Sequence, residues 1–155
     1  MGAMSNSDSK SLSQARFDQF ARGYITSQTH AKGAELDRLV EVAQPGPDWV
    51  MLDVATGGGH IALKFAPPVA RVVATDLTPS MLEAAQAFLA DNAVTNVTFE
   101  QADAEAVPFE AGTFDLVTCR IAPHHFPDCP RFIKESARVL KAGGLLLVQD
   151  HVLPE

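Results

Sequence analysis

A short apolar segment that runs directly into three glycines constrains the fold of this chain most. Residues 49–55 are apolar except for Asp53, and Gly57-Gly58-Gly59 follows after Thr56. Residues 61–66 then have helical character and are stopped by Pro67-Pro68. Glycines after a strand let the backbone turn sharply and approach a ligand, and the free N–H groups of the next helix point to the same place. The segment therefore predicts a strand, a tight turn with a ligand site, and a helix.

Strand and helix patterns alternate along the rest of the chain. Helices are expected over 12–22, 30–43, 79–90 and 131–140, and further strands over 71–75, 97–100, 114–119 and 145–148. This alternation predicts an α/β fold with a doubly wound, mostly parallel, Rossmann-like sheet and right-handed crossovers. Ligands bind such sheets outside the carboxyl ends of the strands, so candidate site residues are expected just after strands.

Composition narrows the class of partner and the compartment. The 155 residues carry a net charge of −7, which argues against nucleic acid or an anionic membrane as the main partner. No apolar run approaches the roughly 18 residues of a membrane span. The two cysteines, Cys119 and Cys129, have no metal-ligand spacing, so we expect a reduced, cytoplasmic protein without a metal.

The chain is expected to form one domain after a short start. Residues 1–10 are polar and rich in serine, and Gly2-Ala3-Met4 has the character of a cloning remnant. We expect residues 1–11 to be a tag and a disordered start. Residues 12–155 are then a single cofactor-binding domain, with helices within 12–43 ahead of the first strand.

The glycine turn alone leaves two cofactor classes open. Gly57, Gly59 and Ala62 fit the G-x-G-x-x-A pattern of dinucleotide-binding turns, so NAD stays a candidate at this point. A carboxylate at the end of the second strand, Asp76, can accept two hydrogen bonds from a ribose diol, which also suits NAD. The alternative role for Asp76 is to cap the helix that begins at Pro79.

The segment after the third strand favours a different cofactor. Asp103 can accept a hydrogen bond from an adenine amino group, and the N–H of Ala104 can donate to a ring nitrogen. A NAD site has no particular need for an Asp followed by the apolar stretch 106–109. The alternative is an acidic surface loop.

Taken together, these motifs resemble the class I S-adenosylmethionine-dependent methyltransferases, especially the ubiquinone/menaquinone C-methyltransferase-like branch. The resemblance runs from about Phe17 to the end of the chain. The segments that carry it are Leu52-Asp53-Val54-Ala55-Thr56-Gly57-Gly58-Gly59, Thr75-Asp76-Leu77-Thr78, Met81-Leu82, Ala102-Asp103-Ala104, Pro108-Phe109, Phe114-Asp115-Leu116-Val117 and Arg138-Val139-Leu140-Lys141-Ala142-Gly143-Gly144.

The resemblance implies a role for each cofactor-side residue. Asp53 would face the methionine end of S-adenosylmethionine, and Arg120 would lie where backbone contacts to that end are made. Asp76 would hold the ribose. The remaining implied residues are Ala55, Gly57 and Gly59 under the cofactor, Leu77 against the adenine ring, and Asp103 with Ala104 at the adenine edge. The family often has Gly where Ala55 stands, and we expect the methyl group to be tolerated.

No catalytic residue is assigned, but two regions supply acceptor-side candidates. His124 and His125 follow the fourth strand, where a histidine could act as a base because its pKa lies near neutrality. The alternative is that one packs against the next helix and the other is solvated. Tyr24 and His30 precede the first strand, in helices that the resemblance places over the cofactor. Simple helix packing is the alternative there. The expected acceptor is a small organic molecule.

The family's sheet has seven strands, and this sequence supplies five. The expected fold therefore lacks the last two strands, and 145–148 would form an exposed apolar edge. We expect a second copy of the chain to cover that edge. A truncated chain could bind the cofactor without turnover, so a cofactor-binding or structural fragment is an alternative function. A NAD-linked oxidoreductase is a weaker alternative. It would need a catalytic Tyr-Lys pair or a similar arrangement, and the only tyrosine, Tyr24, lies before the fold's first strand.

Overall fold

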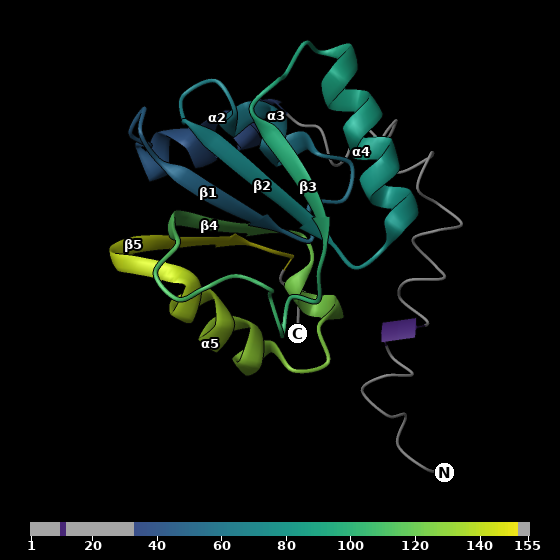
Figure 1. Ribbon diagram of the computed structural model, residues 1–155, viewed down its shortest axis with the longest axis vertical. Coiled ribbons are helices and arrows are strands. Elements are labelled where there is room, and N and C mark those ends of the chain that lie inside the picture. The colour runs from purple at the N-terminus through teal and green to yellow at the C-terminus, as the bar shows by residue number, and fades with distance from the viewer. Residues whose placement is uncertain (1–9, 12–32, 152–155) are drawn as a thin grey trace.

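The computed structural model describes Lys10, Ser11 and residues 33–151. A five-stranded sheet lies between helices on its two faces (Figure 1). In chain order the elements are α2 (Gly33–Ala43), β1 (Val50–Val54), α3 (His60–Phe65), β2 (Arg71–Asp76), α4 (Pro79–Asp91), β3 (Val97–Gln101), β4 (Phe114–Arg120), the 3-10 turn η1 (Pro123–His125), α5 (Cys129–Val139) and β5 (Leu140–Gln149). The predicted α/β class is confirmed.

All neighbouring strands run parallel, in the order β3-β2-β1-β4-β5. The register pairs Asp53 of β1 with Ala74 of β2 and with Thr118 of β4. Because parallel strands end at the same edge, the segments that follow β1, β2, β3 and β4 meet there. Among the described residues, most of the cofactor-side residues predicted from the sequence lie at this edge.

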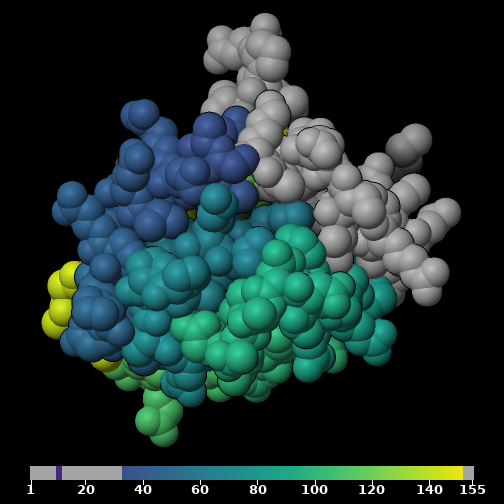
Figure 2. All heavy atoms as spheres, turned by 90° about the horizontal axis from the view of Figure 1, so that it is seen from above, coloured from purple at the N-terminus to yellow at the C-terminus, as the bar shows by residue number. Residues whose placement is uncertain are grey.

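Successive side chains of each central strand enter different hydrophobic layers. One layer packs under α2, α3 and α4, and the other packs against α5. This is the period-two alternation of a strand that is buried on both faces. Figure 2 shows side chains of α2, α3 and α4 closing over the first face. The strand residues that alternate in this way are Met51, Val72 and Leu116 in the first layer, and Leu52, Val73 and Val117 in the second.

The fifth strand begins earlier than expected. The sequence predicts a turn over 141–144, but β5 already pairs with β4 at Leu140, and the register then shifts before Leu145. Gly143 has φ +79°, so the extra residues form a bulge within the strand rather than a free turn. Among the described residues β5 pairs only with β4, and it therefore forms an edge of the sheet.

The helix starts follow local chemistry. Pro79 begins α4 just after Thr78, and the carboxylate of Asp128 accepts a hydrogen bond from the N–H of Arg131 at the start of α5. The cap explains why α5 begins at Cys129, earlier than the apolar pattern indicates. Among residues 33–151, every helix is too short or too polar to cross a membrane.

The start of α3 depends on a glycine that packs tightly. Gly59 has φ +86°, and an added Cβ would lie 3.2 Å from the Cβ of Ala85 in α4. Gly112 also has a positive φ, +67°, but an added Cβ there would meet open space. Comparing an alanine substitution at Gly59 with one at Gly112 therefore separates the cost of steric overlap from the cost of backbone strain.

We predict that Gly59→Ala lowers the free energy of unfolding by about 2–4 kcal/mol, because it adds overlap with α4 to left-handed strain. Gly112→Ala should cost only about 1 kcal/mol, from the strain alone. Urea unfolding followed by circular dichroism measures both. Equal losses at the two positions would contradict the close packing of α3 on α4.

Candidate functional site

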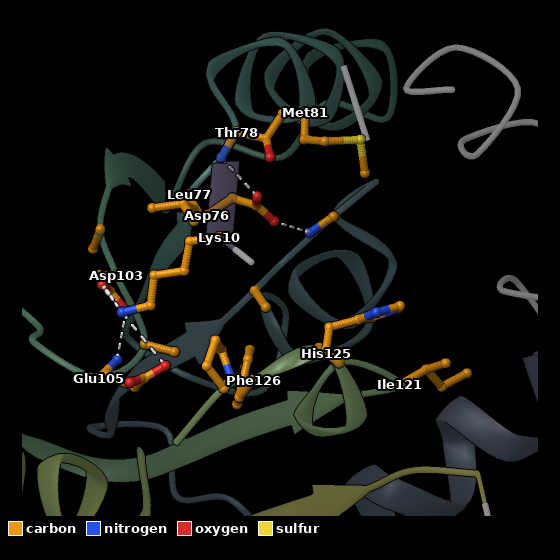
Figure 3. Close-up of a pocket in the computed structure, with 16 residues that line it drawn as sticks. Lys10, Asp76, Leu77, Thr78, Met81, Asp103, Glu105, Ile121, His125 and Phe126 are labelled. Carbon is orange, nitrogen blue, oxygen red and sulfur yellow. Dashed lines mark hydrogen bonds and ion pairs between the residues drawn. The ribbon is translucent and has the colours of Figure 1, made fainter. Parts of the chain in front are cut away.

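Two neighbouring hollows lie at the carboxyl edge of the sheet, and Ala55 lines both. The larger has an empty volume of about 720 Å³, and the smaller about 300 Å³. Figure 3 shows Asp76 and Met81 on one side of the larger pocket, with His125 and Phe126 on the other. The larger pocket is lined by Lys10, Ala55, Gly57, Asp76, Leu77, Thr78, Met81, Ala102, Asp103, Ala104, Glu105, Ile121, Ala122, His125, Phe126 and Pro127. The smaller is lined by Asp53, Ala55, Thr56, Gly58, His60, Ile61 and Arg120.

The carboxylate of Asp76 joins two turns of the pocket. One oxygen accepts a hydrogen bond from the N–H of Gly57 at 2.9 Å, and the other accepts one from the N–H of Thr78 at 3.0 Å. Burial raises the pKa of Asp76, although these N–H groups act in the opposite direction. Asp76 therefore holds the residue that precedes α4 and lines the pocket. The alternative that it caps this helix was wrong, because Thr78 occupies the cap position and no side-chain cap hydrogen bond is made there.

The turn after β1 uses left-handed backbone at three positions. Ala55 has φ +54° and Gly57 has φ +55°. The left-handed conformation at Ala55 gives a physical reason for the preference for Gly that the resemblance noted, because glycine adopts it without a steric cost. Gly59 is not among the pocket-lining residues; it ends the turn and packs α3 against α4.

At the far end of the pocket, Asp103 and Glu105 face a cation. Lys10 Nζ donates to an Asp103 oxygen at 2.6 Å and lies 3.5 Å from a carboxylate oxygen of Glu105 (Figure 3). Burial acts to lower the pKa of Lys10, but the two carboxylates outweigh it and raise the pKa. The other Asp103 oxygen accepts the N–H of Glu105 at 2.9 Å. Asp103 thus presents a carboxylate to donors inside the pocket.

Asp53 lies deepest in the smaller hollow, with only 1 % of its surface exposed. Its two oxygens accept hydrogen bonds from the hydroxyl groups of Thr56 at 2.6 Å and Thr118 at 2.7 Å. Burial raises the pKa of Asp53 to about 7, against these hydrogen bonds. A carboxylate that is costly to bury and faces a cavity is a candidate for binding a cationic group.

Arg120 supplies the opposite charge in the same hollow. Its Nε donates to Oε1 of Gln149 at 2.9 Å, and a terminal nitrogen donates to Glu35 of α2 at 3.1 Å. The side chain is almost fully buried. These contacts hold the guanidinium beside Asp53 and connect α2 with the carboxyl ends of β4 and β5.

The segment after β4 forms the apolar side of the larger pocket. Ile121 has φ +52°, a rare conformation for a β-branched residue, and its N–H donates to the carbonyl of Gln149 at 2.7 Å. His125 and Phe126 line the pocket with it (Figure 3). His124 is not in the lining, but its ring lies against that of His125, with centroids 3.9 Å apart.

The structure brings together most of the residues that sequence analysis selected. The cofactor-side set meets around the two hollows, apart from Gly59, while Tyr24 and His30 lie outside the described residues. Several lining residues had no site signal in the sequence. Ile121 and Phe126 could have been found from their position after a strand, but Lys10 lies in the stretch assigned to the start of the chain.

Comparison with known proteins identifies the family. Residues 52–148 match the methyltransferase domain family, and the chain belongs to it. The uncharacterized methyltransferase YcgJ of Bacillus subtilis is 39% identical over 139 residues, covering 90% of this chain and 55% of that protein. The crystal structure of YcgJ superposes with a TM-score of 0.75 at 41% identity, covering 77% of this chain and 51% of that one.

A second relative belongs to the branch that the sequence resembles. The ubiquinone/menaquinone biosynthesis C-methyltransferase UbiE of Shewanella frigidimarina is 37% identical over 120 residues, covering 75% of this chain and 48% of that protein. The chain thus spans about half the length of the curated relatives it matches.

The raised pKa of Asp53 predicts a pH-dependent stability cost. The folded pKa, about 7, exceeds the usual value of 3.8, so the folded state binds more protons between these values and loses stability as pH rises through them. Asp53→Asn removes this cost and should raise the free energy of unfolding at pH 8 by on the order of 3 kcal/mol.

At pH 4 the same substitution should have little effect, since Asp53 is then protonated in the folded chain. Thermal unfolding of both proteins at pH 4 and pH 8 measures the difference. An asparagine variant that is less stable at pH 8 would show that the carboxylate is not penalised by burial.

Proposed function

We propose that the two hollows bind S-adenosylmethionine and that this chain forms the cofactor-binding part of a methyltransferase for a small organic molecule. The observation that carries the proposal is that the two hollows lie next to each other, on either side of Ala55. One offers hydrogen-bond acceptors for a nucleoside, and the other offers paired opposite charges. The family membership gives independent support.

The ribose would lie at Asp76. Each carboxylate oxygen of Asp76 already accepts one main-chain hydrogen bond, from Gly57 and from Thr78. An ionised carboxylate oxygen accepts about two hydrogen bonds, so capacity remains on the pocket side for the two hydroxyl groups of a ribose. The main-chain bonds also fix the carboxylate in place before a ligand arrives.

The adenine would lie between Leu77 and the Asp103-Ala104 turn. Leu77 and Ala104 contribute apolar surface to the pocket, and Asp103 already accepts a hydrogen bond from a cationic donor, Lys10. The exocyclic amino group of adenine is also an N–H donor, although it carries no charge. It would share the carboxylate with Lys10 or replace it there.

The amino-acid end of the cofactor would lie in the smaller hollow. A methionine moiety carries an ammonium and a carboxylate, and Asp53 and Arg120 offer the matching charges. An ammonium beside Asp53 would favour its ionised form and thereby offset the cost of burial that holds its pKa near 7. Gly57, which lines the larger pocket, would lie under the cofactor, and Gly59 would support this turn from its contact with α4.

When bound, S-adenosylmethionine supplies a methyl group activated on a sulfonium. The chain's own residues would orient the reactants and exclude water. Ile121, Phe126 and Pro127 give the acceptor side an apolar lining, which suits a small organic molecule. We also propose that residues 12–43, which include Tyr24 and His30, form a lid over the cofactor. Of this segment, the structure describes residues 33–43.

Binding of S-adenosylhomocysteine tests the cofactor assignment. Asp76→Ala should weaken it by about 1–3 kcal/mol, the cost of losing a charged hydrogen-bond partner. The matched control is Asp91→Ala, at the exposed end of α4, which should leave the affinity unchanged. Titration calorimetry measures both, and circular dichroism verifies that each variant is folded. Binding of NAD in place of S-adenosylhomocysteine by the wild type would refute the proposal.

The β5 edge is the proposed interface with a second copy of the chain. Val148 in the edge strand is 41% exposed, and the strand pairs on one side only among residues 33–151. Unpaired apolar edges favour pairing with another strand. This assembly is separate from cofactor binding and does not depend on it.

Sedimentation velocity should therefore show a dimer for the wild type and a shift towards monomer for Val148→Lys, because a charge opposes edge pairing. Ile133→Lys is the matched control, since Ile133 is 43% exposed and belongs to α5 rather than to the edge strand, and it should leave the dimer intact. A monomeric wild type would exclude this interface.

A further inference from the structure

A histidine–aspartate pair lies beside the apolar side of the pocket. Asp150 follows the last residue of β5, and His124 lies in η1, after β4. Because Arg120 of β4 is paired with Gln149 of β5, the two segments leave the sheet side by side. Sequence analysis selected His124 but not its partner, 26 residues further along the chain.

Asp150 holds both the main chain and the ring of His124. One carboxylate oxygen accepts the N–H of His124 at 2.8 Å, and the other lies 2.6 Å from Nδ1 of the ring. Burial acts to raise the pKa of Asp150, but hydrogen bonds from His151 and His124 outweigh it and lower the pKa. Asp150 is therefore ionised at neutral pH and acts as an acceptor.

This contact selects the tautomer of His124. A carboxylate can only accept, so the proton of a neutral imidazole is held on Nδ1, and Nε2 keeps its lone pair. The His124 side chain is 41% exposed, and Nε2 is the ring nitrogen that Asp150 does not hold. Its ring lies against that of His125, which lines the pocket, so the His124–Asp150 pair lies next to the pocket, one side chain outside its lining.

The lining next to the pair indicates the class of acceptor. Ile121, Ala122, Phe126 and Pro127 give that side of the pocket an apolar and partly aromatic surface. Such a surface packs against a flat ring, and a hydroxyl on that ring would be the group within reach of a base next to the pocket.

We propose that His124, oriented by Asp150, is the base that removes the proton from a phenolic hydroxyl of the methyl acceptor; this rests on the proposed methyltransferase function. The acceptor O–H bond breaks and its proton passes to Nε2. The oxygen electron pair forms the new bond to the methyl carbon, while the electrons of the methyl–sulfur bond stay on sulfur. The imidazolium is balanced by Asp150 and returns its proton to solvent. Asp150 is a positioning residue.

The tautomer tests the pair without any turnover. In the wild type labelled with ¹⁵N-histidine, nitrogen shifts should place the His124 proton on Nδ1 at a pH where the ring is neutral. Asp150→Asn should shift His124 towards the Nε2–H form, because the amide no longer demands a donor. His151→Asn is the matched control and should leave the His124 signals in place. A wild type with the proton on Nε2 would overturn the proposal.

Methyl transfer to two phenols tests the chemistry. At pH 8, 4-nitrophenol is largely ionised and needs no base, whereas phenol is protonated. His124→Asn and Asp150→Asn should lower kcat on phenol by about 100-fold and change kcat on 4-nitrophenol by less than about threefold. S-adenosylhomocysteine affinity should stay at the wild-type value in both variants, and His151→Asn should behave as the wild type.

The outcomes separate this inference from the proposed function. Equal losses on the two phenols would show a merely structural role for the pair and overturn the inference. A wild type that binds S-adenosylhomocysteine but methylates neither phenol would also overturn it, leaving cofactor binding intact. A wild type that binds no S-adenosylhomocysteine would overturn the proposed function, and this inference with it.

Discussion

The carboxylate of Asp76 is the interaction on which the pocket depends. It sits at the end of β2 and satisfies main-chain N–H groups on both sides, at Gly57 after β1 and at Thr78 before α4. Without it, two buried donors would lack partners at the point where the chain must leave space for a ligand. The parallel pairing of β1 with β2 brings the two turns close, and the carboxylate then fixes them relative to each other.

The site is built from groups that the fold alone would not favour. Asp53 and Asp76 are carboxylates buried next to cavities, and the pKa of each is raised by burial. Ala55 and Ile121 hold left-handed backbone at the pocket walls. Strain and buried charge gathered in one place are typical of a binding site, because a bound ligand can offset the cost of both.

The fold was largely predictable because its signals are local. Alternating apolar residues placed the strands, and proline and glycine placed the ends of several elements. The bulge at Gly143 was not predictable, because it depends on pairing with β4. The Asp103-Ala104 turn could be selected as a site from its place after a strand, and it favoured S-adenosylmethionine where the glycine pattern also allowed NAD.

Contacts between distant segments account for what the sequence did not show. Asp150 belongs to no recognisable motif. Its contact with His124 forms only because β4 and β5 leave the sheet side by side, so the sequence did not predict it. The contact of Lys10 with Asp103 joins residues that are 93 positions apart. In both cases the residue type is compatible with many roles, and only the tertiary arrangement shows which side chain it contacts.

A crystal structure of this chain with S-adenosylhomocysteine tests the central claim most directly. We expect the ribose hydroxyls at Asp76, the adenine amino group at Asp103, and the amino-acid end between Asp53 and Arg120. A ligand bound elsewhere, or one whose ribose does not contact Asp76, would contradict it.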